Sequence, residues 1–243
     1  MGAPPVDESS SADGKLPDTK TPPDAINLNV GGKELAGPQR GFGQLWRKTY
    51  CVRLQGSSAT PREVIARWKS RFADYWPEGN DFYGSRPRIE KGEVAVINLT
   101  SPVGAPIATG IAVVHADAES FSFVTPQGHI FAGIIHFSAY RENTPDAPPV
   151  TVAQVESTMR AGDPLFEIGA RLGLVHRQED TFWQKTLANL AADFGARGAP
   201  VQMQSVLLDR RMRWSAIGNV WHNSAIRTTL YLPIHGLRRL LGK

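Results

Sequence analysis

The sequence predicts an α+β protein in which a curved antiparallel sheet wraps around a long C-terminal helix, with an additional C-terminal helical extension. Three observations lead to this prediction. Short runs that alternate between apolar and polar residues recur from residue 49 to residue 159, separated by turns rich in Pro and Gly. One helical pattern follows the first run, and a longer one follows the last. Because a sheet with one apolar face must be covered, we expect the long helix to cover it.

The first strand and the first helix are expected soon after residue 45. Residues 49–54 alternate as the residues of a half-buried strand do. Thr60 then supplies an N-cap and Pro61 suits the first helical position, and apolar residues recur at helical spacing as far as Phe72. The helix should end before Pro77, because the residue that precedes a proline avoids the helical region.

Several antiparallel strands should follow, joined by turns. The clearest signal is the segment 125–129, Thr-Pro-Gln-Gly-His, which lies between two apolar runs and predicts a β-hairpin. The predicted strands span residues 93–99, 107–115, 120–124, 129–140 and 150–159, with loops at 77–87 and 143–149.

Helices dominate the region after residue 163. Asp163 as N-cap and Pro164 at the first position predict a short helix. Residues 178–194 carry an apolar stripe and end at Gly195, which predicts a longer helix. A further strand is expected over residues 201–208 and a helix over 219–232, which Pro233 should break or kink before a short basic end.

Composition and charge restrict the function classes. The 27 basic and 23 acidic residues are mixed along the chain, so we expect no nucleic-acid partner. The single cysteine, Cys51, permits no internal disulfide and no Cys-based metal site. No segment has the pattern of a signal peptide or a membrane span, so a cytoplasmic protein is expected. The basic end at residues 237–243 has two interpretations, contact with an anionic membrane surface or a complement to the helix dipole, and we favour the second.

This order of elements resembles the helix-grip (SRPBCC) superfamily of START-like and polyketide-cyclase-like proteins, and more narrowly the uncharacterised family DUF1990. The matching residues are 125–129, the strand 131–140 and the segment Arg160-Ala161-Gly162-Asp163-Pro164-Leu165, within a region of about 46–195. The resemblance implies an elongated cavity between sheet and helix. In some relatives such a cavity binds or cyclises bulky apolar molecules, but no particular reaction is implied. Better-known members carry acidic residues shortly after the Gly-His pair, where this chain has Phe131-Ala132-Gly133.

The chain is accordingly divided into a disordered tail (1–43), a helix-grip ligand-binding domain (44–195) and a C-terminal extension packed on it (196–243). The tail is predicted from six of the eighteen prolines and from the lack of any aromatic residue before Phe42. The expected function is binding of a bulky apolar small molecule of lipid, isoprenoid or polyketide type. The alternatives are a cofactor-free cyclase or isomerase that uses the same cavity, and a structural protein with a filled core. The oligomeric state is left open.

Four residues are candidates for acid–base catalysis: His129, His136, Glu167 and Glu179. In an apolar cavity desolvation would shift their pKa values, and such a group could donate or accept a proton near neutral pH. The alternative for each is a hydrogen-bonded histidine or a solvated helix-face glutamate. His129 and His136 are an odd number of residues apart, so a regular strand places them on opposite faces. No metal or cofactor is expected, because no His-x-x-x-His or Glu-x-x-His spacing occurs.

Large side chains supply the candidate ligand contacts. Aromatic residues in the predicted loop, strand and helices form the set Trp76, Tyr83, Phe131, Tyr140, Trp183 and Trp221. Trp76 and Tyr83 lie in a loop placed to close over the cavity. The alternatives are that Trp183 belongs to the core and that Trp221 only docks the extra helix.

Overall fold

The computed structural model describes residues 15–17, 25–26, 28–101, 104–143, 145 and 148–240, without the side chains of 238–240. Within these residues one eight-stranded antiparallel sheet has the order β2-β3-β4-β5-β6-β7-β1-β8. Its strands are β1 (Leu45–Arg53), β2 (Asp81–Tyr83), β3 (Val94–Thr100), β4 (Pro106–Ala116), β5 (Ser120–Val124), β6 (Phe131–Glu142), β7 (Val150–Ala161) and β8 (Val201–Asp209).

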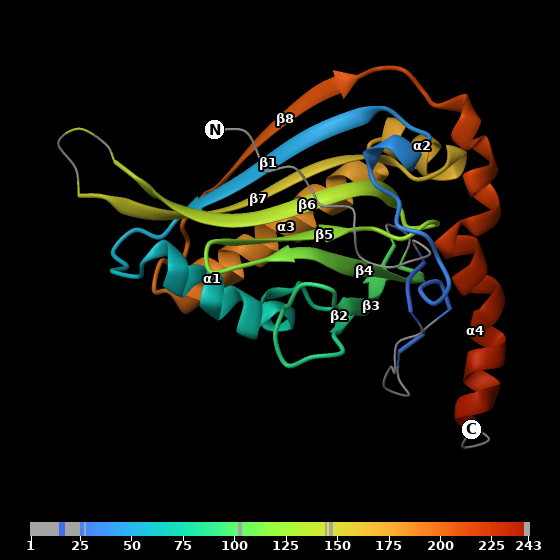
Figure 1. Ribbon diagram of the computed structural model, residues 1–243, viewed down its shortest axis with the longest axis horizontal. Helices are drawn as coiled ribbons and strands as arrows, with labels where there is room; N and C mark the ends of the chain where they lie inside the picture. The colour runs from blue at the N-terminus through green and yellow to red at the C-terminus, as the bar shows by residue number, and fades with distance from the viewer. Residues whose placement is uncertain are drawn as a thin grey trace.

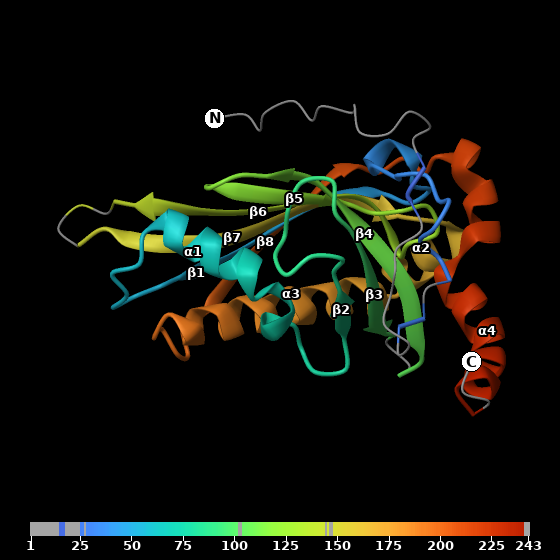
Figure 2. The same ribbon diagram turned by 60° about the horizontal axis from the view of Figure 1, so that its bottom comes forward.

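The helices lie mainly against one face of this sheet. They are α1 (Pro61–Ser70), α2 (Pro164–Arg171), α3 (Leu174–Asp193) and α4 (Ser224–Leu240), with the 3₁₀ segments η1 (Pro38–Arg40), η2 (Phe72–Tyr75) and η3 (Trp214–His222). Figures 1 and 2 show α3 running along the concave face of the bent sheet, with α1 on the same side. The predicted α+β helix-grip architecture is therefore confirmed.

Local sequence explains where the helices begin. The side chain of Thr60 accepts a hydrogen bond from the N–H of Glu63, whose carboxylate accepts one from the N–H of Thr60. Asp163 caps α2 by accepting from Leu165 and Phe166. These caps satisfy amide groups that have no partner inside the helix.

Aromatic rings fill one part of the space between the sheet and the helices. We name Trp68, Phe72, Phe121, Phe123, Phe137 and Trp183 the aromatic cluster. Phe121 and Phe137 stack with centroids 4.4 Å apart, and Trp68 meets Phe137 edge-on at 5.4 Å. Trp183 of α3 reaches the ring of Phe137 at 5.5 Å. Ring pairs in these arrangements stabilise a core beyond the area that they bury.

The N-terminal boundary differs from the prediction. Residues 28–43 pack on the domain: Val30 is fully buried against β3 and β4, and Phe42 is also buried. The Cβ of a larger residue at Gly110 would lie 2.6 Å from Val30, so this strand glycine admits the segment. The predicted tail (1–43) therefore wrongly includes residues 28–43. Residues 1–14, 18–24 and 27 lie outside the described residues.

The C-terminal part joins the same sheet and packs on it. β8 pairs with β1 along its length. β5 pairs with β4 only from Ala112 onward, which leaves the backbone of Ala108 without a strand on that side. The N–H of Ala108 donates to Thr228 of α4, and its carbonyl accepts from the side chain of Asn29. α4 therefore covers a strand edge that β5 is too short to reach.

Three differences from the predicted elements are larger than a shift of a few residues at one end. β2 lies in a region predicted as a loop, and it is only three residues long. The helix predicted over 219–232 is divided into η3 and α4 by Asn223, which is buried and donates to Asp163. Pro233 does not end α4, which continues to Leu240, and the proline lies on the exposed side of the helix.

Candidate functional site

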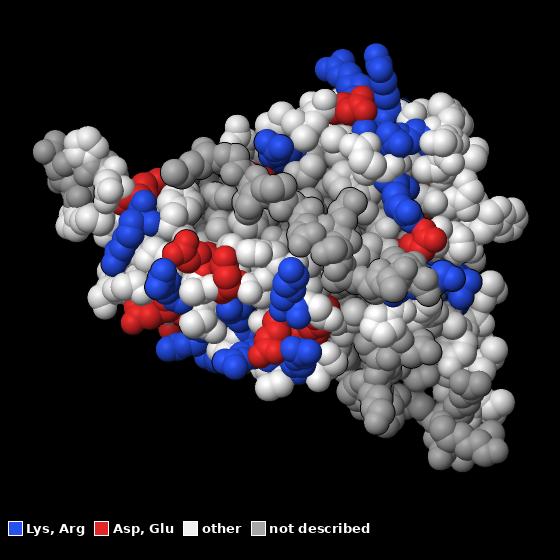
Figure 3. All heavy atoms as spheres, viewed as in Figure 1, with Lys and Arg blue, Asp and Glu red and all other residues white. Residues whose placement is uncertain are grey.

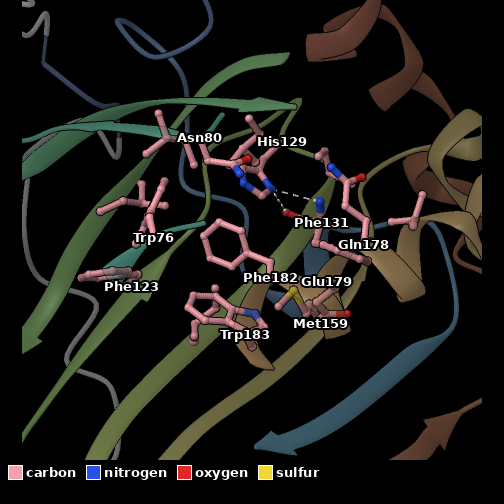
Figure 4. Close-up of a pocket in the computed structure, with 16 residues that line it drawn as sticks. Trp76, Asn80, Phe123, His129, Phe131, Met159, Gln178, Glu179, Phe182 and Trp183 are labelled. Atoms are coloured by element: carbon pink, nitrogen blue, oxygen red, sulfur yellow. Dashed lines mark hydrogen bonds between the residues drawn. The ribbon is translucent and has the colours of Figure 1, made fainter. Parts of the chain in front are cut away.

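A cavity lies between the sheet and α3, beside the aromatic cluster. Its volume is about 90 Å³. Its sixteen lining residues come from the loop after η2, from β3 to β7 and from α3 (Figure 4). They are Trp76, Asn80, Ile97, Leu99, Ile111, Phe123, His129, Ile130, Phe131, Ile135, Met159, Val175, Gln178, Glu179, Phe182 and Trp183. The sheet and α3 thus leave a hollow where the packed rings end.

The walls are apolar with few polar groups. Only Asn80, His129, Gln178 and Glu179 are polar among the sixteen. Strand alternation explains the apolar majority, since residues two apart on a strand share its inward face. A cavity with this lining favours apolar ligands that carry one or two polar groups.

Five partly exposed lining residues mark the solvent end of the cavity, and we name them the rim: Trp76, Asn80, Leu99, Gln178 and Phe182. The side chain of Gln178 donates to the carbonyl of Thr100, and Asn80 accepts from the N–H of Thr100. Trp76 meets the ring of Phe182 at 5.0 Å. Among the described residues, the buried indole N–H of Trp76 has no hydrogen-bond partner. The rim therefore carries a donor that is not satisfied by the protein.

His129 forms part of the buried wall. Its Nδ1 lies 3.0 Å from the amide nitrogen and 3.1 Å from the carbonyl oxygen of Phe131, so it accepts from the first or donates to the second according to the tautomer. Burial lowers the pKa of His129 to about 4, although a hydrogen bond donated to the Phe131 carbonyl acts in the opposite direction. The ring is consequently neutral near pH 7 and acts as a hydrogen-bond donor rather than as a cation.

Glu179 links the cavity to a buried charged group that sequence analysis missed. The ammonium of Lys48 lies 3.0 Å from the carboxylate of Glu179 and 2.7 Å from that of Asp180. The side chains of Lys48 and Glu179 are only 4% and 5% exposed. Ser157 donates to Glu179 at 2.9 Å, and the hydroxyl of Tyr50 donates to Asp180 at 2.7 Å. We name these five residues the Lys48 network.

Burial dominates the electrostatics of this network. The pKa of the Tyr50 hydroxyl is raised strongly, first by burial and then by the negative charges of Glu179 and Asp180. Tyr50 is therefore a permanent donor. A buried carboxylate without partners would be costly. Lys48 and Ser157 are the partners of Glu179, and their contacts hold its carboxylate in place at the wall of the cavity. Positioned carboxylates of this kind can accept protons from a bound molecule.

The structure brings together five of the ten predicted site residues. The cavity is lined by His129 and Glu179 of the catalytic set and by Trp76, Phe131 and Trp183 of the ligand-binding set. Trp183 also belongs to the aromatic cluster, so it is part of the core and at the same time lines the cavity.

The other five residues lie outside the cavity. His136 is half-buried with its Nδ1 2.9 Å from the hydroxyl of Ser122, because β6 turns alternate residues to opposite faces. Glu167 is buried beside Gln44 and is paired with Arg171, while Tyr83 packs against the N-terminal segment.

Tyr140 and Trp221 are exposed, and Trp221 is 81% exposed. Trp221 is therefore not placed as a cavity contact. Its surroundings do not match the alternative interpretation either, because a side chain that docks the extra helix on the domain would be buried.

Strand periodicity could have identified Lys48. On β1 the residues Lys48, Tyr50 and Val52 share one face, and the last two are the apolar or aromatic positions of that face. A lysine on this face requires buried partners of opposite charge. On α3, Glu179 lies one turn before Trp183, which places its carboxylate on the same covering face.

The described residues show neither a metal site nor a membrane span. Among them, no group of three or more His, Cys, Asp and Glu side chains is arranged to hold a metal ion. No helix in the described part of the chain is both long and apolar enough to cross a bilayer.

The sequence matches no family model, and no curated protein matches it. Solved structures with a similar arrangement include the KanY protein, at 11% identity and a TM-score of 0.46, covering 60% of this chain and 95% of that one. The di-domain ARO/CYC StfQ from the steffimycin biosynthetic pathway has 14% identity and a TM-score of 0.44, covering 62% of this chain and half of StfQ. The major latex-like protein 151 from Panax ginseng has 12% identity and a TM-score of 0.40, with 63% and 99% covered. The helix-grip assignment therefore depends on the strand order and on the placement of α3.

Proposed function

We propose that this protein binds an apolar small molecule in the cavity between the sheet and α3. The observation that supports the proposal is a hollow in which twelve of sixteen lining residues are apolar and four are polar. Five of the apolar residues are aromatic: Trp76, Phe123, Phe131, Phe182 and Trp183. We also propose that the protein belongs to the DUF1990 family and is cytoplasmic.

The size of the cavity limits the ligand. A dry cavity of roughly 150 Å³ accepts benzene, whereas this one has a volume of about 90 Å³. A lipid, isoprenoid or polyketide-like molecule therefore enters only when the rim opens. Trp76 and Phe182 are the rim groups whose rotation enlarges the space, and the unpaired N–H of Trp76 offers a hydrogen bond to a ligand oxygen.

Probe binding by matched variants tests the proposal. The folded protein should enhance the fluorescence of N-phenyl-1-naphthylamine, an uncharged apolar probe. Leu99→Trp fills the rim and should weaken probe binding at least about tenfold, because it removes the volume that the rings of the probe occupy. Leu165→Trp adds the same group on the exposed side of α2 and should leave binding unchanged. Equal binding by wild type and Leu99→Trp, or none by wild type, would contradict the proposal.

A second candidate function is a cofactor-free cyclase or isomerase acting in the same cavity. The Lys48 network favours it, because Glu179 lies at the wall with its charge balanced from behind. In this candidate Glu179 accepts a proton from the bound molecule, and neutral His129 donates a hydrogen bond to the oxygen that becomes negatively charged. The walls would hold a flexible substrate in the reactive conformation.

Turnover distinguishes the two candidates. A binder returns an incubated poly-β-ketone unchanged, whereas an enzyme returns a product of altered connectivity. Glu179→Gln should abolish turnover and leave probe binding within about twofold, because shape is retained. Glu167→Gln removes a buried carboxylate outside the cavity and is the matched control. Retained turnover in both variants would disprove the assignment of Glu179.

A further inference from the structure

Exposed apolar side chains lie along η3 and α4, and we name this set the C-terminal apolar face. Its members are all exposed, with Trp221 at 81% and Leu230 at 72%. They are Trp214, Ile217, Trp221, Ile226, Leu230, Ile234 and Leu237. In Figures 1 and 2, η3 and α4 form one column at the end of the sheet opposite the hairpin that joins β6 and β7. Large exposed apolar patches mark interaction sites.

Helical geometry places the apolar residues of α4 on one side. Ile226, Leu230, Ile234 and Leu237 follow each other at intervals of four, four and three residues, so they form one stripe. The opposite side of α4, with Ser224 and Thr228 buried, packs against the domain. Packing within the described part of the chain therefore accounts for the polar side of α4 and not for the apolar one. This is the reverse of an ordinary surface helix.

The apolar surface continues onto a neighbouring helix. Leu165, Ile168 and Leu172 recur at helical spacing on and directly after α2, and all three are exposed. α2 contacts η3 in the fold. The exposed apolar residues of α2 and of the C-terminal apolar face are thus parts of one end of the molecule.

Basic and acidic residues are mixed over most of the chain but not in its C-terminal segment. Residues 210–243 contain seven Lys and Arg and no Asp or Glu, whereas the preceding 209 residues contain 20 Lys and Arg and 23 Asp and Glu. The net charge of +4 therefore arises entirely from the C-terminal segment. In Figure 3 the margin where α4 lies is mostly white, and no red group lies on it.

We propose that the C-terminal apolar face docks on an anionic phospholipid bilayer, with α4 lying in the plane of the surface. Helices that bind in this way combine a basic composition with Trp, Phe or Leu on the face that enters the headgroup region. Trp214 and Trp221 supply the side chains that favour the interface. The surplus of Lys and Arg is attracted to anionic headgroups. A protein partner would instead need separate acidic side chains placed to pair with the seven Lys and Arg residues.

Docking through this face does not depend on the cavity or on its ligand. From the sequence alone, a complement to the helix dipole was favoured over membrane contact for the basic end. The structure changes that interpretation, since it shows that the stripe beside the basic residues faces outward.

Co-sedimentation with vesicles tests the proposal on the full chain. We expect binding to vesicles of phosphatidylcholine mixed with phosphatidylglycerol, and at least about tenfold weaker binding to phosphatidylcholine alone. Raising the salt concentration from about 0.1 to about 0.5 M should weaken the binding, because it shortens the screening length. Replacing both Trp214 and Trp221 with Phe should remove most of the fluorescence quenching caused by brominated lipids, because these two tryptophans are exposed on the C-terminal apolar face.

Charge-matched variants locate the contact. Leu230→Asp should weaken binding to anionic vesicles at least about tenfold, since it places a charge in the stripe. Met203→Asp makes a comparable change at an exposed position on β8 and should have no effect. Leu230→Gln keeps the net charge and should still weaken binding, and circular dichroism checks that each variant is folded.

Three results would overturn the proposal. They are absence of binding to anionic vesicles, equal binding by Leu230→Asp and Met203→Asp, and binding that appears only after residues 1–27 are removed. The last result would identify the N-terminal segment as the occupant of the face. A dimer that Leu230→Asp dissociates, without vesicle binding, would identify a second copy of the chain instead.

Discussion

The two halves of the space between the sheet and α3 are built from similar apolar residues but packed differently. In one half the aromatic cluster interlocks, with ring centroids 4.4–5.8 Å apart. In the other half Ile97, Ile111 and Ile135 line a cavity together with His129 and Glu179. The difference shows that apolar content alone does not decide whether such a space is filled. In the first half the rings contact one another directly, whereas in the second half aromatic rings, branched side chains and four polar residues line a hollow.

The largest expected effect is in the filled half. Trp68→Ala should lower the free energy of unfolding by about 4–5 kcal/mol, because the fully buried indole would leave a void among rings that cannot collapse. Phe182→Ala at the rim should cost only about 1 kcal/mol, since this ring is already partly exposed. Urea unfolding followed by circular dichroism measures both values, and similar losses would remove the distinction between the two halves.

The Lys48 network should be the next most sensitive. Lys48→Met should cost about 4 kcal/mol, because it leaves the buried carboxylate of Glu179 unpaired beside that of Asp180. Adding Glu179→Gln to Lys48→Met should recover part of this loss. A double variant that is less stable than Lys48→Met alone would show that the two side chains do not act as a pair. Equilibrium denaturation of the three variants gives the coupling energy.

Acid should destabilise the protein through His129. A solvated histidine has a pKa of 6.5, whereas the pKa of His129 is about 4 in the folded protein, so below about pH 6.5 the unfolded chain binds a proton that the folded chain does not. Stability should therefore fall as the pH decreases from about 6.5 to about 4, by on the order of 3 kcal/mol in total. His129→Gln should flatten this slope in urea titrations. His136→Gln should remove a smaller part, because burial also lowers the pKa of this half-buried histidine.

Added volume should have the smallest effect in the hollow half. Ile135→Phe directs a ring into the cavity and should change stability by less than about 1 kcal/mol while abolishing probe binding. Ile65→Phe makes the same exchange in the packed core and should cost about 1–3 kcal/mol. Thermal unfolding and probe titration compare the pair, and equal costs would mean that the cavity is not open space in solution.

Local patterns were sufficient for most of the fold. The alternation of residues 120–124 and the caps at Thr60 and Asp163 predicted the strand β5 and the starts of α1 and α2. Element ends were less predictable where distant groups decide them. Asn223 divides η3 from α4 through its bond to Asp163, sixty residues away in the sequence, which no local pattern encodes.

The candidate site was predictable only in part, because contacts between residues distant in the sequence also decide which side chains meet there. Phe131 and Trp183 were found because strand and helix periodicity directs them inward. Trp221 was misplaced, because an aromatic residue near a helix start has the same local pattern whether it faces a cavity or solvent. Lys48 was missed because its partners, Glu179 and Asp180, lie on α3, far away in the sequence.

By itself, the sequence determined the types of element, their order and the apolar faces that must be covered, because these depend on residues a few positions apart. Only the tertiary structure decided how large the cavity is, which carboxylate meets Lys48 and which side of α4 remains uncovered. Those properties depend on how the shapes and charges of distant segments fit together, and the period of a single strand or helix carries no information about that fit.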